Sequence, residues 1–193
     1  MLMGQDQLAI SAPERYRLTI NDFLALDAAG VFADKGKFEL IEGEVYQMSP
    51  VHAPHASAIL HIGSQLLTLV SRVDEVLNVL SPVSVKLGDH SLPEPDLVVV
   101  RGPIPEKFVD GRTIVIVVEI AQSSLRYDLD TKVSLYADAA IPEYWIFDLA
   151  GRVVHQFAQP TPKGYTAVEV HPFGARVASK MVPQIVVDTS RIA

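Results

Sequence analysis

The sequence contains no cysteine, which excludes disulfide bonds and thiolate metal sites. It has no apolar run near the roughly 18 residues that a membrane-spanning helix needs. Its 193 residues include 16 Lys and Arg against 23 Asp and Glu, a formal net charge of −7. Nucleic-acid backbones are held mainly by neutralising their phosphates, so this shortage of basic residues counts against a protein devoted to such binding.

The same absences set expectations for compartment and partners. A chain without cysteine is typical of a reducing compartment. The first ten residues, MLMGQDQLAI, have no basic residue before their short apolar patch, so they do not resemble a secretory signal. We therefore expect a cytoplasmic protein without a membrane partner.

Apolar residues make up 49% of the chain, too many for an intrinsically disordered protein. A chain of this length can form one domain with a substantial core. We find no internal repeat and no low-complexity tract. We expect residues 1–16 to be a loose N-terminal leader and residues 17–193 to form a single domain.

Local signals predict the first elements. Residues 19–30 are expected to form a short helix that has Thr19 or Asn21 as its N-cap and stops at Gly30. The segment KFELIEGEVYQM alternates about a central Glu-Gly pair, which is typical of a β-hairpin. A longer helix follows, with Pro54 near its first turn and apolar residues at helical spacing.

Short apolar segments predict the strands of a mixed sheet. Two nearly all-apolar segments, 95–100 and 113–120, indicate strands that are covered on both faces. A helix over about 128–140 follows them. The other expected strands are 75–80, 83–87 and 143–149, and then 152–159, 164–170 and 181–187 near the sheet edge. The predicted fold class is therefore α/β or α+β, with a central mixed sheet and about three main helices.

Three charged residues fall at one end of this predicted sheet. Asp96 begins one strand and Glu119 ends the next, so antiparallel pairing of these neighbours brings the two carboxylates together. The unit from strand 113–119 through the helix to strand 143–148 is a crossover, so the helix starts near the strand end that carries Glu119. Lys132 lies in the first turns of that helix, on the face that points to the sheet.

Two close carboxylates repel each other unless a proton or a cation lies between them. Mg²⁺ is commonly held by one or two carboxylates plus water, and a nearby lysine can orient or help to deprotonate an attacking water. This combination suits phosphodiester hydrolysis. The alternative is a structural ion pair, which is the more frequent outcome for such a trio considered alone.

The quoted segments also carry a family resemblance. The segments PEPD, VVEI, DLDTKVSLYADAAIPEYWIFD and FELIEGEVYQMSP, with a histidine in the following helix, together resemble the Uma-two-type family of restriction-endonuclease-like proteins. This family lies within the PD-(D/E)XK nuclease superfamily, and the similarity covers roughly residues 17–158. It implies a restriction-endonuclease-like central mixed sheet flanked by helices, and divalent-metal phosphodiesterase chemistry.

The resemblance also implies roles for individual residues. Asp96 matches the aspartate of the PD motif, and Glu119 matches the acidic residue of the second half-motif. The lysine expected two residues later is replaced by Ala121, and Lys132 fits a lysine relocated to the next helix. A second departure is the segment AQSS, where the family tends to have Ser-Pro-Ser.

Two further site residues follow from the same resemblance. Glu39 matches an acidic residue that could complete the metal shell or position water. His55 matches a histidine at the start of the long helix, although a histidine on an apolar stripe is more often a core residue. The implied metal ligands are therefore Asp96, Glu119 and Glu39.

The favoured hypothesis is an endonuclease that uses Mg²⁺ or Mn²⁺ to cleave DNA. One alternative, which the acidic charge favours, is a binding or regulatory module that keeps the nuclease fold. Another is a hydrolase of a smaller phosphorylated substrate. A homodimer is expected, because cutting both strands of a duplex suits two copies.

Overall fold

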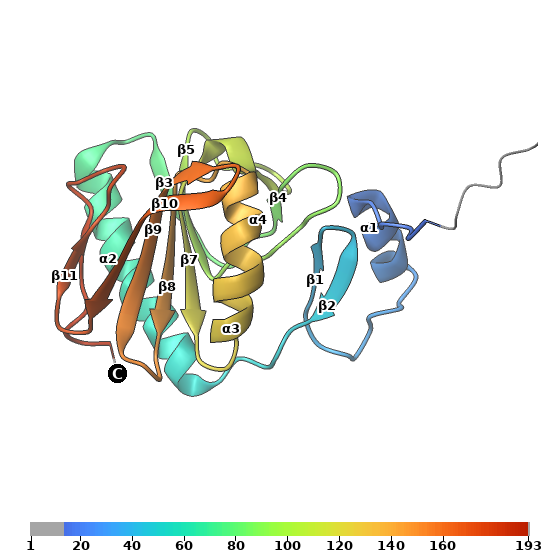
Figure 1. Ribbon diagram of the computed structural model, residues 1–193, viewed down its shortest axis with the longest axis horizontal. Coiled ribbons are helices and arrows are strands. Elements are labelled where there is room, and N and C mark those ends of the chain that lie inside the picture. The colour runs from blue at the N-terminus through green and yellow to red at the C-terminus, as the bar shows by residue number, and fades with distance from the viewer. Residues whose placement is uncertain (1–13, 193) are drawn as a thin grey trace, which may run out of the picture.

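The computed structural model describes residues 14–192. The predicted leader, residues 1–16, lies outside the described residues except for 14–16. A six-stranded mixed sheet forms the centre of the molecule, as Figure 1 shows. Its strands, in the order β10-β9-β8-β7-β5-β3, are β3 (Leu77–Leu80), β5 (Leu97–Arg101), β7 (Ile114–Ala121), β8 (Glu143–Asp148), β9 (Val153–Thr161) and β10 (Gly164–Pro172).

The pairing of the strands follows the predicted topology. β5 and β7 are antiparallel, and β7 and β8 are parallel because a helical crossover joins them. The other neighbouring pairs in this sheet are antiparallel. The predicted fold class, an α/β or α+β mixed sheet flanked by helices, is confirmed.

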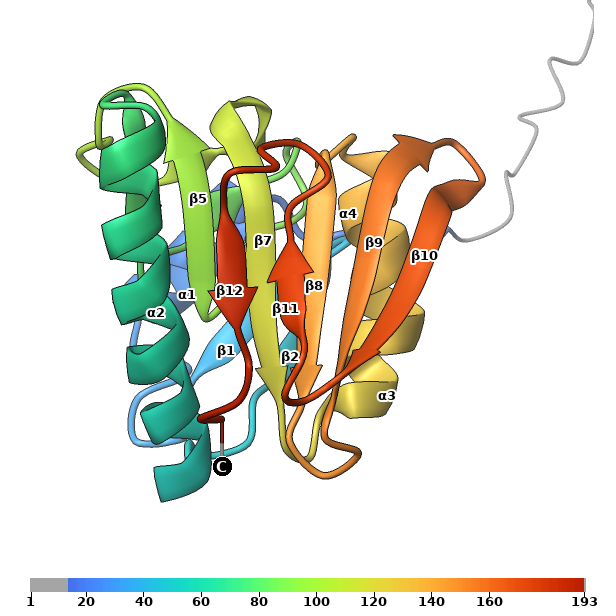
Figure 2. The same cartoon turned by 90° about the vertical axis from the view of Figure 1, so that its left-hand side faces the viewer.

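Both faces of the sheet are covered. Figure 2 shows helix α2 (Ala53–Val73) and the hairpin of β11 (Arg176–Ala178) and β12 (Val186–Asp188) on one face. The other face carries α3 (Leu125–Tyr127), a π-helical turn (Asp128–Lys132) and α4 (Val133–Asp138), which run on as one helical segment. Every residue of β7 is buried, as expected of a strand between two covered faces.

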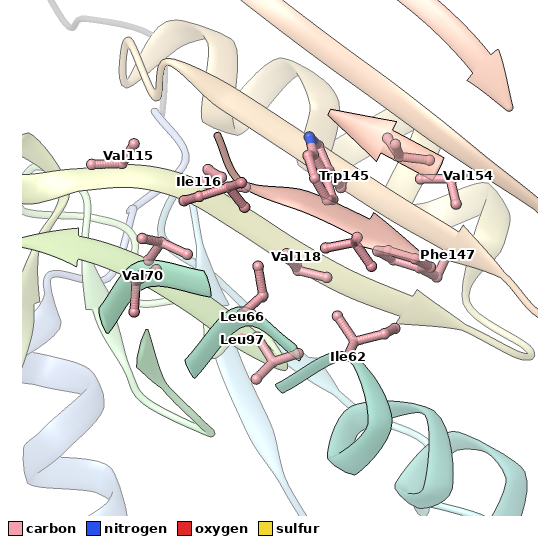
Figure 3. Close-up of a cluster of buried hydrophobic side chains, with 14 of the residues drawn as sticks. Ile62, Leu66, Val70, Leu97, Val115, Ile116, Val118, Trp145, Phe147 and Val154 are labelled. Carbon is pink, nitrogen blue, oxygen red and sulfur yellow. The ribbon is translucent and has the colours of Figure 1, made fainter. Parts of the chain in front are cut away.

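Alternate residues of the central strands pack into two separate apolar cores. Figure 3 shows Ile62, Leu66 and Val70 of α2 packed over Leu97 and Val118 of the sheet. The next residue along each strand faces α4 instead, because side chains alternate across a strand. Each fully buried side chain of this size stabilises the fold by about 1.5–3 kcal/mol.

The N-terminal part forms a third, smaller apolar cluster. Helix α1 (Ile20–Ala28) has Thr19 as its N-cap, in a capping box with Asp22. The hairpin of β1 (Phe38–Ile41) and β2 (Glu44–Gln47) turns at two residues of positive φ, the second being Gly43 at 82°. A Cβ at Gly43 would lie 2.6 Å from the Cβ of Arg17, so this turn requires glycine.

Three details differ from the sequence-based expectations. The segment predicted as an edge strand at 181–187 contributes only β12, which pairs with β11 and lays its apolar side chains over the face of the sheet. The segment 83–87 forms β4 (Val85–Lys86), which pairs with β6 (Val109–Asp110) outside the central sheet; a short 3-10 helix (Gly111–Thr113) follows β6. The predicted helix over 128–140 begins at Leu125 and contains the π-helical turn.

None of the helices in the described part of the chain is both long enough and apolar enough to cross a membrane.

Candidate active site

A pocket of about 270 Å³ lies where β1, the start of α2, the end of β7 and the π-helical turn meet. All five residues singled out from the sequence line it: Glu39, His55, Asp96, Glu119 and Lys132. They come from five different segments of the chain, and the central sheet fixes two of them directly.

The pairing of β5 and β7 places Asp96 beside Glu119. Leu97 is opposite Val118 in the antiparallel register, so the residues on either side of this pair adjoin each other. Asp96 Oδ2 accepts a hydrogen bond of 2.8 Å from the backbone N–H of Ile120. This bond holds the Asp96 side chain at the end of β7.

The imidazole of His55 points to the same carboxylate. Its Nε2 lies 3.2 Å from Asp96 Oδ2, and both side chains are only 14% exposed. His55 Nδ1 is buried and has no hydrogen-bond partner in the described residues. His55 is therefore a wall of the pocket and not a core residue, although it continues the apolar stripe of α2.

Lys132 places a buried ammonium among carboxylates. Its side chain is 2% exposed, and Nζ lies 2.7 Å from Glu119 Oε1 and 3.3 Å from Glu39 Oε2. The hydroxyl of Tyr136 donates to the same Glu119 oxygen at 3.2 Å. Both bonds fall on Oε1, so Oε2 of Glu119 remains for another partner.

The π-helical turn sets the position of Lys132. The backbone N–H of Val133 donates to the carbonyl of Asp128, five residues back, which defines this wider turn. Asp128 and Lys132 are the two buried residues of the turn, and both line the pocket. Such turns often occur at functional sites, where the extra residue redirects side chains.

Glu39 enters the pocket from the β1–β2 hairpin. Its Oε1 accepts the backbone N–H of Glu94 at 3.2 Å, and the ammonium of Lys37 lies 3.8 Å from that oxygen. Its Oε2 is buried and makes no hydrogen bond within the described residues. The hairpin thus delivers a buried carboxylate oxygen whose charged neighbour is the Lys132 ammonium, 3.3 Å away.

Burial and charge together shift the ionisation of this cluster. Burial raises the pKa of Glu119 to about 8; Lys132 opposes this shift, and the carboxylates of Asp96, Asp128 and Glu39 add to it. Burial alone would lower the pKa of Lys132, but the carboxylates of Glu119, Glu39 and Asp128 outweigh it and raise that pKa. Lys132 therefore carries its proton.

The carboxylate oxygens of the pocket provide part of the ligand set that a hard divalent cation needs. Within residues 14–192, no three His, Asp or Glu side chains are arranged to hold a metal ion, so the predicted set of Asp96, Glu119 and Glu39 is not assembled. The reason is that Lys132 lies between Glu119 and Glu39. Asp96 and Glu119 remain as a pair, and two carboxylates completed by water or phosphate are a usual Mg²⁺ site.

Sequence reasoning missed some residues of the pocket. Asp128 is buried, and its Oδ2 accepts a 2.6 Å hydrogen bond from Ser124 Oγ. Burial is the main cause that raises its pKa. The sequence signal that could have identified Asp128 is its position four residues before Lys132, because residues at that spacing share a helix face.

Comparison with known proteins agrees with this architecture. The model of the Uma2 family, described as "putative restriction endonuclease", matches residues 20–190. A crystal structure described as a "putative nuclease" of the DUF820 family from Anabaena variabilis superposes with a TM-score of 0.69. The identity is 18%, and the alignment covers 91% of this chain and 97% of the other, so the likeness concerns the fold. No curated protein matches the chain.

Proposed function

Since this chain belongs to the Uma2 family of restriction-endonuclease-like proteins, we propose that it is a divalent-metal-dependent nuclease that hydrolyses DNA phosphodiester bonds in the pocket described above. The observation that carries the proposal is the contact of a fully buried ammonium, Lys132, with Glu119 beside Asp96. A purely structural ion pair does not require a pocket, whereas these groups line one.

Asp96 and Glu119 are the proposed ligands of Mg²⁺ or Mn²⁺, and Glu39 and Asp128 are further carboxylates of the same pocket. Such a cation supplies charge stabilisation to the phosphate and makes a bound water more acidic. The sheet holds Asp96 through the N–H of Ile120, and His55 fixes the orientation of that carboxylate. These contacts preorganise the oxygens before a substrate arrives.

Lys132 is proposed as a hydrogen-bond donor. Its ammonium is held by Glu119 and Glu39 and keeps its proton, so it is suited to orient a water or to stabilise negative charge on a phosphate oxygen. The geometry does not favour the sequence-based idea that it removes a proton from water. The hydrogen bond from the Tyr136 hydroxyl holds the Glu119 carboxyl group beside this ammonium.

Cleavage of plasmid and of short single strands in Mg²⁺ or Mn²⁺ tests the proposal. Asp96→Asn, Glu119→Gln and Lys132→Met should each lower the rate by a factor on the order of 10² or more. Glu44→Gln is the matched control, because Glu44 lies exposed on the same hairpin as Glu39 and outside the pocket. Equal rates in all four variants would contradict the assignment.

The second candidate is a hydrolase of a smaller phosphodiester. The net charge of −7 favours it, because an acidic surface repels a long polyanion more than a small ester. Hydrolysis of bis(p-nitrophenyl) phosphate without cleavage of DNA would establish this alternative. Binding of DNA without hydrolysis of either substrate would indicate a binding module.

We also propose a homodimer, because two copies suit the cutting of both strands of a duplex. Sedimentation equilibrium measures this directly, and a monomer at every concentration would refute it.

A further inference from the structure

A second cavity, of about 450 Å³, lies on the other side of the β1–β2 hairpin from the proposed active site. It is lined by α1, the segment that follows α1, the start of β1 and the residues before β4, β5 and β6. The side chains that matter for its chemistry are four aromatic rings and three charges: Phe23, Phe32, Phe38, Phe108, Asp27, Glu94 and Lys107.

One strand separates this cavity from the catalytic pocket. Phe38 and Glu39 are consecutive residues of β1, so their side chains point to opposite sides. Glu39 lines the catalytic pocket and Phe38 lines the second cavity, while Glu94 lines both. The ammonium of Lys37 lies at this shared wall, 2.9 Å from the carbonyl oxygen of Glu94.

Three of the rings pack on one another in the apolar cluster beside the cavity. Phe32 stacks on Phe38 with ring centres 4.6 Å apart, and Phe23 lies 5.3 Å from Phe32. Phe108 is half-buried and lies beside Ser84, because the N–H of Val109 donates to the Ser84 carbonyl. The cavity lies beside these rings, where a closed apolar core would have been filled.

The charges at this cavity suit a nucleotide. The ammonium of Lys107 lies 4.8 Å above the ring of Phe108, at the exposed rim where a flanking phosphate would pass. The carboxylate of Asp27 and the hydroxyl of Ser84 also line the cavity and accept hydrogen bonds, as the amino edges of bases require.

We propose that this cavity binds one nucleobase of the nucleic-acid substrate, next to the phosphodiester that is cleaved. The inference rests on the proposed nuclease function. Aromatic rings bind bases by stacking, whatever the base, and a base reaches such a cavity only when it is out of the duplex stack. The preferred substrate is accordingly a single strand or a flipped nucleotide.

The acceptors predict a preference among bases. Asp27 and Glu94 accept from the exocyclic amines of adenine, cytosine and guanine, whereas thymine has no such amine. A strand of thymines should bind more weakly than a strand of cytosines of equal length.

Binding of short single strands that contain 2-aminopurine, with Ca²⁺ in place of Mg²⁺, tests the inference. Stacking should change the fluorescence of the probe, and Phe108→Ala should remove the change and weaken binding about tenfold. A strand without bases should bind to the wild type as weakly as the normal strand binds to Phe108→Ala. Phe173→Ala is the matched control, because Phe173 is also half-buried but packs on Phe147, away from the cavity.

Phe108→Leu keeps much of the packing volume and removes the ring, so it covers the case in which the alanine variant does not fold. Thermal melting of each variant shows whether it is folded. Equal affinity of normal and baseless strands, or equal behaviour of the Phe108 and Phe173 variants, would overturn the inference. If the protein cleaves DNA but one of these two results is found, only the base site is refuted. If the fluorescence change depends on Phe108 but no DNA is cleaved, only the nuclease function is refuted.

Discussion

Lys132 Nζ lies 2.7 Å from Glu119 Oε1, inside a cluster of buried carboxylates. The contact joins the π-helical turn to the end of β7. It explains why the core tolerates these two ionisable groups, because each is the closest polar partner of the other. Taking away Lys132 leaves Glu119 buried without its cationic partner.

Lys132→Met should therefore destabilise the protein as well as inactivate it. Loss of the ammonium leaves Glu119, Glu39 and Asp128 close together, and we expect a loss of about 3 kcal/mol in the free energy of unfolding. Lys132→Arg keeps the charge and should lose less. Urea denaturation of the three proteins measures the difference, and identical midpoints would show that the pair adds nothing to stability.

The raised pKa of Glu119 predicts a pH dependence of stability. The folded state holds a proton on Glu119 up to about pH 8, whereas the unfolded state releases it near 4.5. Stability should therefore fall as the pH rises from about 4.5 to 8, by at most about 1.4 kcal/mol per pH unit. Glu119→Gln has no carboxyl group to titrate at this position, so the stability of this variant relative to the wild type should rise with pH. Parallel curves for the two proteins would contradict the assignment.

His55→Ala should lower the rate of cleavage about tenfold without unfolding the protein, because His55 acts by orienting Asp96. His55→Gln retains an N–H group and should recover part of the loss. A rate that does not change in either variant would assign His55 to packing alone. Steady-state cleavage kinetics with a melting control distinguishes these outcomes.

A second buried carboxylate, Glu143, predicts an effect on stability alone. It accepts hydrogen bonds from Trp145 Nε1 at 2.7 Å, Gln156 Nε2 at 2.7 Å and Ser179 Oγ at 2.6 Å. It thereby ties the β11–β12 hairpin to the start of β8. Glu143→Ala leaves Trp145 Nε1 and Ser179 Oγ without this buried acceptor, while Gln156 Nε2 keeps the carbonyl of Ala178; the loss should cost about 3 kcal/mol.

Fluorescence of the single tryptophan provides the second readout for Glu143→Ala, since Trp145 loses its acceptor. Cleavage per folded molecule should not change, because Glu143 does not line the catalytic pocket. A fall in cleavage at full folding would place this network within the catalytic machinery.

Much of this site could be predicted because it depends on strand order. The apolar runs that end at Glu119 and follow Asp96 identify two adjacent central strands, and adjacency is enough to bring the carboxylates together. The helix that carries Lys132 could be placed because parallel strands require a crossover.

Other features left no comparable signal. Hydrophobic spacing predicts a helix around Asp128 but does not distinguish a π-helical turn from an α-helical one. The apolar residues of β12 have the pattern of an edge strand, whereas in the structure they cover the face of the sheet. The three-carboxylate metal set was inferred without the ammonium that separates Glu39 from Glu119.

A crystal structure of the protein soaked in Mn²⁺, with anomalous diffraction, tests the central claim most directly. The account predicts one strong peak in the catalytic pocket, about 2.2 Å from an oxygen of Asp96 and one of Glu119. A peak bound elsewhere, or no peak in crystals of protein that cleaves DNA in Mn²⁺, would contradict it.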